Sequence, residues 1–340
     1  MNTSEEILSF LAKHESVTGA QLAGHLKISP QAVHKHLKVL IQEGKVVKEG
    51  ITRSARYGLP AKRTSPLLKQ LKKVYALEGL EEDAVFRDVA AQCRLSQELS
   101  KQAFEIFRYA FTELLNNAID HSRSRECSIQ VRIDHYQASF LIRDFGIGIF
   151  NSINAKYDLG SEENAVGELI KGKTTTMEER HSGEGIFFSS KSADTLAIRS
   201  HRINMLFHNL EKDIFVEQRK FIEGTEVHFT VSRHSRRDLP NIFAAYSPEQ
   251  YDYGFEKTRV LVKLFRKDYT SRSEARRILS GLDKFREIIF DFNGVRSIGQ
   301  GFADELFRVF PLQYQGITVR AENATSLIDQ MIRHVVGNKN

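Results

Sequence analysis

The sequence is poor in cysteine and in long apolar runs. Its 340 residues include two cysteines, Cys93 and Cys127. Two cysteines are too few for a disulfide framework, and their spacing matches no metal-binding motif. No apolar run approaches the roughly 18 residues of a membrane span, and the first residues, with Glu5 and Glu6, lack the pattern of a signal peptide. These absences predict a cytoplasmic protein with reduced thiols and no membrane contact.

The positive charge is concentrated at the N-terminal end. Residues 1–63 hold ten Lys and Arg against five Asp and Glu, so this segment carries five of the six net positive charges. A basic segment is often only a solvated surface, but it is also typical of domains that bind nucleic acid. At 340 residues with 41% hydrophobic content, the chain is long enough for two or three domains.

Three apolar stripes at helical spacing divide the basic segment into three short helices. The third helix has clear boundaries, because Ser29 is a good N-cap, Pro30 suits the first helical position and Gly44 ends the helix. Residues 46–48 and 53–59 are predicted to form the two strands of a basic hairpin. The stripes consist of Ile7, Leu8 and Leu11, of Leu22, Ala23 and Leu26, and of Val33, Leu37, Leu40 and Ile41.

Residues 1–60 are therefore similar to the winged helix-turn-helix domain of bacterial transcription regulators. The resemblance implies binding to double-stranded DNA, with the third helix in the major groove and the hairpin, or wing, at the backbone or minor groove. The alternative is a winged helix that docks a protein or dimerises. The candidate DNA-binding residues are Gln31, His34, Lys35 and Lys38 on the helix, and Arg53 and Arg56 on the wing.

Residues 61–83 are predicted to form a helical connector. They begin with a basic run around Pro66, and their apolar residues then keep helical spacing. These apolar residues are Leu67, Leu68, Leu71, Val74 and Tyr75.

The segment FTELLNNAIDHS, residues 111–122, is predicted to form a helix with two different faces. Its apolar residues continue an arc that begins at Phe104 and Phe107, while Glu113, Asn117 and Asp120 lie on the opposite side. Two strands follow, at 129–133 and 138–143, and the second ends in the glycine-rich turn DFGIGIF at 144–150. A second glycine pair lies in HSGEGI at 181–186, ahead of an apolar segment.

This order of motifs resembles the ATP-binding module of the GHKL family, which includes gyrase, the Hsp90 chaperones, histidine kinases and MutL. The family's motifs are an acid followed four residues later by Asn-Ala, then Asp-x-Gly-x-Gly, a polar lid and a second Gly-x-Gly. The resemblance covers residues 84–232 and implies an α/β sandwich that binds ATP with Mg²⁺. It also implies that Asp144 accepts a hydrogen bond from the adenine amino group, that Thr225 lies beside adenine, and that Glu113 is the general base of any hydrolysis.

The residues themselves fit such a site. An amide oxygen such as that of Asn117 can bind Mg²⁺, and glycine-rich turns at helix N-termini offer N–H donors to phosphates. Glu113 is otherwise a helix-surface charge, and the lid, residues 150–182, is otherwise a solvated loop. The candidate nucleotide-binding residues are Asn117, Asp144, Gly146, Gly148, Lys173, Thr174, Gly183, Gly185 and Thr225.

The last hundred residues alternate between strand and helix patterns, which predicts a small parallel sheet covered by helices over residues 255–337. The run DFNGVRSIGQGFADEL, residues 291–306, resembles the strand-turn-helix of STAS domains, which bind protein partners. The family's phosphorylated serine should follow Gly299, where this chain has Gln300, and Ser297 lies three residues early. Glutamine cannot accept a phosphoryl group, so this departure argues against phosphotransfer at that turn.

The chain as a whole is predicted to be a multidomain α/β protein with a winged helix, a GHKL-type sandwich and a STAS-like domain. The main hypothesis is an ATP-gated, DNA-binding regulator that forms a homodimer, with a possible protein partner at the STAS-like domain and slow Mg²⁺-dependent hydrolysis. Two alternatives stay open: a serine kinase that acts on a separate protein, and an interaction scaffold with a structural nucleotide.

Overall fold

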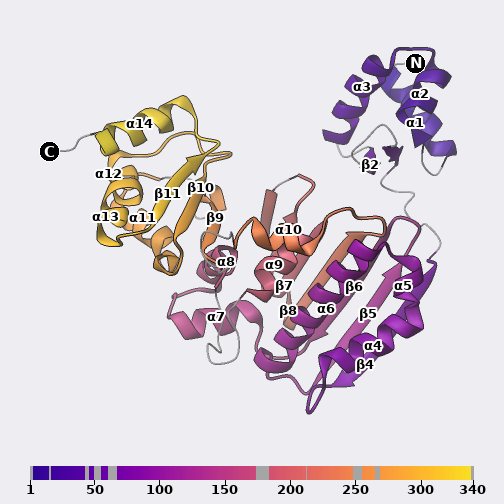
Figure 1. Cartoon of the computed structure of the whole chain (residues 1–340), viewed down its shortest axis with the longest axis horizontal. Helices are drawn as coiled ribbons and strands as arrows, with labels where there is room; N and C mark the ends of the chain where they lie inside the picture. Colours follow the sequence, from indigo (N-terminus) through magenta and orange to yellow (C-terminus); the bar gives the residue numbers. More distant parts are fainter. Residues whose placement is uncertain are drawn as a thin grey trace. The chain divides into compact units, whose positions relative to one another are not determined.

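The structure is a computed structural model that divides into two compact units, Met1–Leu67 and Leu68–Asn340 (Figure 1). None of the helices in the described part of the chain has both the length and the apolar character that a membrane span requires. The described residues are 3–14, 17–42, 46–49, 55–59, 67–173, 184–211, 213–247, 255–264 and 269–337.

The N-terminal unit contains three helices and a small antiparallel sheet in the order β1-β3-β2. The apolar stripes of the helices form its core, in which Ile7, Leu22 and Leu37 are almost fully buried. Strand β1 was not predicted, because two residues are too few for an alternating pattern. The elements are α1 (Thr3–Lys13), β1 (Val17–Thr18), α2 (Gly19–Leu26), α3 (Pro30–Gln42), β2 (Val47–Glu49) and β3 (Arg56–Gly58).

The predicted start of the third helix is confirmed. The Ser29 hydroxyl accepts a hydrogen bond from the backbone N–H of Ala32 at 3.2 Å, and Pro30 is the first helical residue. The two wing strands pair as predicted, with Lys48 opposite Tyr57. The turn between them, residues 50–54, lies outside the described residues; it includes Arg53, which is predicted to contact DNA.

The second unit begins with a central domain, residues 68–232, built on an antiparallel sheet in the order β4-β5-β6-β8-β7. Side chains alternate between a buried face and a more polar face, as in Cys127, Ile129 and Val131 against Ser128 and Gln130. The strands are β4 (Lys69–Ala76), β5 (Glu126–Ile133), β6 (Gln137–Asp144), β7 (Thr195–His208) and β8 (Asp213–Ser232).

The prediction of a helical connector over residues 61–83 is wrong for its central part. Residues Lys69–Ala76 form β4, which pairs with all eight residues of β5. Leu71 and Tyr75 face the core, and between them Lys73 forms an ion pair with Asp88 at 2.7 Å. Strand pairing with a distant segment overrides a local spacing that also fits a helix.

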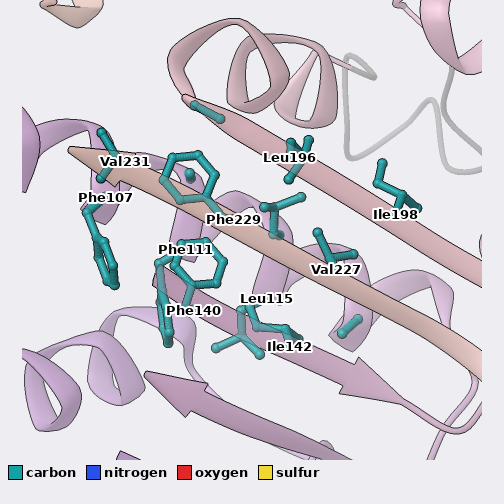
Figure 2. Close-up of a cluster of buried hydrophobic side chains, with 14 of the residues drawn as sticks. Phe107, Phe111, Leu115, Phe140, Ile142, Leu196, Ile198, Val227, Phe229 and Val231 are labelled. Carbon is teal, nitrogen blue, oxygen red and sulfur yellow. The ribbon is translucent and has the colours of Figure 1, made fainter. Parts of the chain in front are cut away.

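One face of the central sheet is covered by helices, of which α6 lies across its middle (Figure 1). Phe107 and Phe111 of α6 contact Phe140 of β6 edge to face, and Phe140 stacks on Phe229 of β8 (Figure 2). The predicted apolar arc of α6 is therefore the core contact. The helices of the central domain are α4 (Glu82–Cys93), α5 (Leu95–Glu98), α6 (Lys101–His121), α7 (Ile149–Tyr157), α8 (Glu162–Lys171) and α9 (Gly185–Ser192).

The C-terminal domain, residues 255–337, has the predicted parallel sheet, in the order β11-β10-β9. All five residues of β10 are buried, as expected for the central strand of a parallel sheet. A short helix, α10 (Leu239–Ala244), precedes the domain. The elements are β9 (Lys257–Leu261), η3 (Val262–Leu264), α11 (Arg272–Leu279), η4 (Leu282–Lys284), β10 (Glu287–Asp291), α12 (Gln300–Asp304), η5 (Glu305–Val309), α13 (Phe310–Gln313), β11 (Thr318–Glu322) and α14 (Ser326–Gly337).

Candidate functional site

A pocket opens in the central domain between α6, the turn after β6, α7 and the start of α9. Its volume is about 1020 Å³ when the open solvent at its mouth is included; we call it the Asp144 pocket. Six predicted residues line it: Glu113, Asn117, Asp144, Gly148, Gly185 and Thr225. These residues come from four separate segments of the chain, and the fold brings them together.

Asp144, at the end of β6, is held in place by its neighbours. Its Oδ1 accepts hydrogen bonds from the backbone N–H of Gly146 at 3.0 Å and of Thr225 at 3.1 Å. The Thr225 hydroxyl in turn accepts a bond from the backbone N–H of Ile149 at 3.0 Å, which ties the start of α7 to β8. This corner of the pocket is therefore fixed without a ligand.

The Asp144 side chain is also buried, with 5% of the residue exposed. Burial raises the pKa of its carboxyl above the ordinary value, while the bonds from Gly146 and Thr225 act in the opposite direction. A buried carboxylate at a pocket wall is typical of a group whose hydrogen-bonding capacity serves a ligand.

The two glycines after Asp144 have different roles. A Cβ on Gly146 would lie 1.8 Å from the backbone oxygen of Ser122, so the turn packs directly on the end of α6, and Gly146 itself does not line the pocket. Gly148 does line it, with φ +78° in the left-handed region that favours glycine. Of these two predicted nucleotide-binding glycines, Gly148 therefore lies at the pocket, and Gly146 shapes the turn behind it.

Asn117 and Glu113 lie one turn apart on α6. The Asn117 amide nitrogen donates to the backbone oxygen of Glu113 at 2.9 Å, which leaves the amide oxygen for a cation. The Glu113 carboxylate lies against the first turn of α9, because a Cβ on Gly185 would be 2.1 Å from its Oε2. Within the described residues, no group of three His, Cys, Asp or Glu side chains is placed to bind a metal by itself.

Lys173 is not among the residues that line the pocket. Its ammonium group donates to the backbone oxygen of Lys284 at 2.9 Å, lies 3.4 Å from the Glu256 carboxylate and sits 4.9 Å from the ring centroid of Phe285. All three partners belong to the C-terminal domain. The predicted residues Thr174 and Gly183 lie outside the described residues.

The apolar walls of the pocket were not predicted as site residues. They combine core positions of α6 and the sheet with residues of the predicted lid, which forms α7 and α8 over most of its described length. Helical spacing of apolar residues within 149–171 is the signal that could have found them. The apolar lining residues are Leu114, Ala118, Ile142, Ile149, Ile153, Leu169, Ile186, Phe187 and Val227.

The third helix of the N-terminal unit presents the predicted polar surface. Val33, Leu37 and Leu40 are buried, which turns the opposite side of α3 to solvent. The four helix residues predicted to contact DNA are all exposed, and Arg56 is exposed on β3. The exposed helix residues are Gln31, His34, Lys35 and Lys38.

Comparison with protein families gives three matches along the chain. Residues 2–47 match a winged helix-turn-helix DNA-binding family, residues 79–206 a histidine kinase-like ATPase domain, and residues 274–327 a STAS-like domain of unknown function. The chain carries these three domains in this order. A search of curated proteins finds no match. The winged helix supports DNA binding, and the ATPase domain supports a nucleotide-binding module in the same protein.

The ATPase domain and the STAS-like domain are joined at Lys171, the last residue of α8. Its side chain is 1% exposed, and its ammonium group contacts Glu168 Oε1 at 2.5 Å and donates to the backbone oxygen of Ser280 at 2.7 Å. The Thr258 hydroxyl donates back to the Lys171 oxygen at 2.6 Å. Burial lowers the pKa of Lys171, and Glu168 opposes that shift. The end of α8, within the predicted lid, is thus fixed to the STAS-like domain.

An aromatic cluster extends this junction beside the start of α9. The rings of Phe187 and Phe255 lie 4.5 Å apart between centroids, and those of Phe188 and Phe255 lie 5.0 Å apart. Phe187 also lines the Asp144 pocket. One side chain therefore contacts both the pocket and the STAS-like domain.

Gln300, in the position that the resemblance assigns to a phosphorylated serine, is exposed at the start of α12. Gly299 before it packs tightly, since a Cβ there would lie 2.6 Å from the backbone oxygen of Thr270. The turn has the predicted strand-turn-helix geometry, with an amide at the exposed position 300 and an exposed hydroxyl three residues earlier at Ser297.

Proposed function

We propose that this protein is a DNA-binding regulator whose ATPase domain binds ATP with Mg²⁺, and whose nucleotide state controls the binding of DNA or of a partner protein. The observation that carries the proposal is the fixed corner of the pocket at Asp144. A buried carboxylate that is oriented by Gly146 and Thr225 is suited to read one hydrogen-bond donor on a planar ligand.

In this proposal adenine lies between the apolar walls and donates its amino group to Asp144. Oδ1 already accepts two backbone bonds, so Oδ2 would read the amino group. Asn117 would supply one oxygen to Mg²⁺, and the phosphates and water would supply the others, because Mg²⁺ keeps several of its waters in protein sites. The N-terminus of α9 at Gly185 faces the same pocket and favours anions.

The gating step would run through α8. This helix lines the pocket with Leu169 and ends at Lys171, which is bonded to the STAS-like domain. A γ-phosphate that draws Lys173 into the pocket would remove it from Lys284 and Glu256. Closure of the lid would therefore compete with contacts to the STAS-like domain, and nucleotide could shift the population of two arrangements.

Hydrolysis, where it occurs, would use Glu113 to activate water, since its carboxylate lies at the first turn of α9 inside the pocket. A homodimer is part of the same proposal, because winged-helix regulators commonly read paired half-sites. Exposed Lys35 and Lys38 on α3 support contacts with DNA.

The decisive experiment measures both ligands on the full chain. Calorimetry with ATP, with and without Mg²⁺, should show adenine-nucleotide binding that the metal strengthens. Fluorescence anisotropy with duplex DNA should then give different affinities with and without a nonhydrolysable ATP analogue. If no adenine nucleotide binds under either condition, the regulator proposal fails; if nucleotide binds but DNA affinity does not change, the gating of DNA binding fails while nucleotide binding stands.

A further inference from the structure

A second pocket lies at the other end of α9, away from the Asp144 pocket. Its volume is about 740 Å³ with its open mouth included. It is formed by the end of α9, the turn after β7, the loop after β8 and the helix α10. Its lining residues are Lys191, Asn209, Arg236, Arg237, Asp238, Asn241, Ile242, Ala245 and Tyr246.

Several polar groups in this second pocket already have partners. Asp238 caps α10, since its carboxylate accepts from the backbone N–H and the side-chain amide of Asn241, each at 2.9 Å. Arg237 donates to the backbone oxygen of Ala193 and pairs with Asp194. These groups maintain the shape of the pocket and add little to its binding capacity.

Two cations and one hydroxyl are left over. Within the described part of the chain, Lys191 and Arg236 form no ion pair or hydrogen bond through their side chains, and neither does the Tyr246 hydroxyl. The Lys191 ammonium instead lies over two rings, 4.9 Å from the centroid of Phe187 and 5.6 Å from that of Tyr246. Aromatic faces stabilise a cation only weakly compared with an oxyanion.

The pKa of Lys191 also indicates a cation that lacks an anionic partner. Burial and the neighbouring Arg259 guanidinium lower the pKa of Lys191 to about 8. Arg259 is itself neutralised by Asp291 and Glu322, which leaves Lys191 without a carboxylate of its own. Burial also raises the pKa of Tyr246, so its hydroxyl stays protonated and can donate.

We propose that this second pocket binds the phosphate or carboxylate group of a small molecule, with Lys191 as its main contact and Arg236 and Tyr246 as further donors. Ile242 and Ala245 offer an apolar wall to the rest of the ligand. Three donors gathered around one open hollow, with Arg236 exposed at its surface, fit a small anion better than an extended polymer. The proposal is independent of nucleotide binding. The two pockets have one side chain in common, because Phe187 lines the Asp144 pocket and its ring also lies under the Lys191 ammonium.

Thermal melting of the full chain in increasing sodium phosphate or sodium acetate, against sodium chloride at equal ionic strength, tests this site. Wild type should show a saturable rise in Tm with at least one of the two anions. Lys191→Met should abolish the rise and Lys191→Arg should retain it, because arginine keeps the charge. Lys156→Met is the matched control, since Lys156 also lies in the last turn of a helix and over an aromatic ring, outside this pocket.

The two anions identify the ligand class: a response to phosphate alone indicates a phosphate ester, and a comparable response to acetate indicates a carboxylate. The same rise in Lys191→Met as in wild type would overturn the proposal, because phosphate would then bind elsewhere, for example at α9 Gly185. The absence of a saturable rise with either anion in wild type would overturn it as well. If Lys191→Met does not fold, Arg236→Ala decides: it should weaken the apparent affinity several-fold, and an unchanged affinity counts against the site.

Discussion

The two ends of the proposed nucleotide site, which at the phosphate end extends beyond the pocket to Lys173, differ in how their side chains are held. At the proposed adenine end, Asp144 and Thr225 are bonded to backbone groups of the same domain. At the proposed phosphate end, the cation Lys173 is bonded to the STAS-like domain. In the proposed function, base recognition would need no rearrangement, whereas phosphate recognition by Lys173 would require its contact with another domain to break. The identity of the ligand would then be read at one end and the signal transmitted from the other.

The largest expected effect comes from breaking the rigid end. Gly146→Ala would place a Cβ 1.8 Å from the Ser122 oxygen, and backbone on both sides must shift. We expect a loss of about 3 kcal/mol or more in the free energy of unfolding, at the upper end for overpacking. Calorimetric melting of the full chain measures it.

Gly79→Ala is the control, since Gly79 has positive φ but no atom within 4 Å of its added Cβ. It should cost about 1 kcal/mol, as expected for a backbone conformation that alanine disfavours. Equal losses in the two variants would mean that the turn at Gly146 adapts and is not rigid.

The second prediction separates ligand reading from stability at the same end. Asp144→Asn keeps an oxygen for Gly146 and Thr225 but replaces the second acceptor with a donor. We expect the free energy of ATP binding to weaken by about 1–3 kcal/mol, which is roughly a fivefold to 150-fold loss of affinity. Calorimetric titration with ATP and with adenosine should show the same relative loss for both ligands, because both carry the amino group. A loss of affinity for ATP alone would indicate that Asp144 contacts the phosphates and not the base.

The same substitution gives a pH-dependent readout without nucleotide. The pKa of Asp144 is raised in the folded state, so its contribution to stability is fully present below the unfolded pKa and is lost as pH rises through the folded value. The unfolding free energy of Asp144→Asn, relative to that of wild type, should therefore increase as the pH rises above about 4. Urea unfolding of both proteins at several pH values measures the difference. An unfolding free energy of wild type that increases with pH relative to that of Asp144→Asn would contradict a pKa raised by burial.

The mobile role proposed for Lys173 predicts a smaller and more selective effect. Lys173→Ala should weaken ATP binding by about 1 kcal/mol, roughly fivefold, because the gain at the phosphate is partly offset by the lost contact with Lys284. Adenosine affinity should not change. If Lys173→Ala changes the affinities for ATP and adenosine equally, Lys173 stays bonded to the STAS-like domain when nucleotide is bound. The difference between the two ends then persists in the bound state.

Substitutions in the winged helix are expected to have the smallest effect on the pocket. Lys35→Ala and Lys38→Ala should each weaken DNA binding and reduce the slope of log affinity against log salt by about 0.9 for each phosphate contact that is lost. ATP affinity should remain that of wild type in both variants. Anisotropy titrations at several salt concentrations measure the slope, and an unchanged slope would favour a winged helix that docks protein.

Much of the fold follows from local patterns. The alternation in the last hundred residues predicts the parallel sheet, and the polar side of α6 with the turn after Asp144 predicts one wall of the pocket. Strand β4 was missed because Leu71, Val74 and Tyr75 also fit helical spacing, and its pairing with β5 joins segments far apart in sequence. The position of Lys173 was not predictable for the same reason, since its partners Glu256 and Lys284 belong to a different domain.

Lys171 has a consequence for protein engineering. This lysine comes from one domain, while the carbonyl of Ser280 and the hydroxyl of Thr258 that satisfy it come from the next. Cutting the chain between them would expose an amine and the rings of Phe187 and Phe188 at once. Truncated versions should therefore be prone to self-association, and a functional chimera would need to inherit the helix that ends at Lys171 and its partners, the acceptor Ser280 and the donor Thr258, from a single parent.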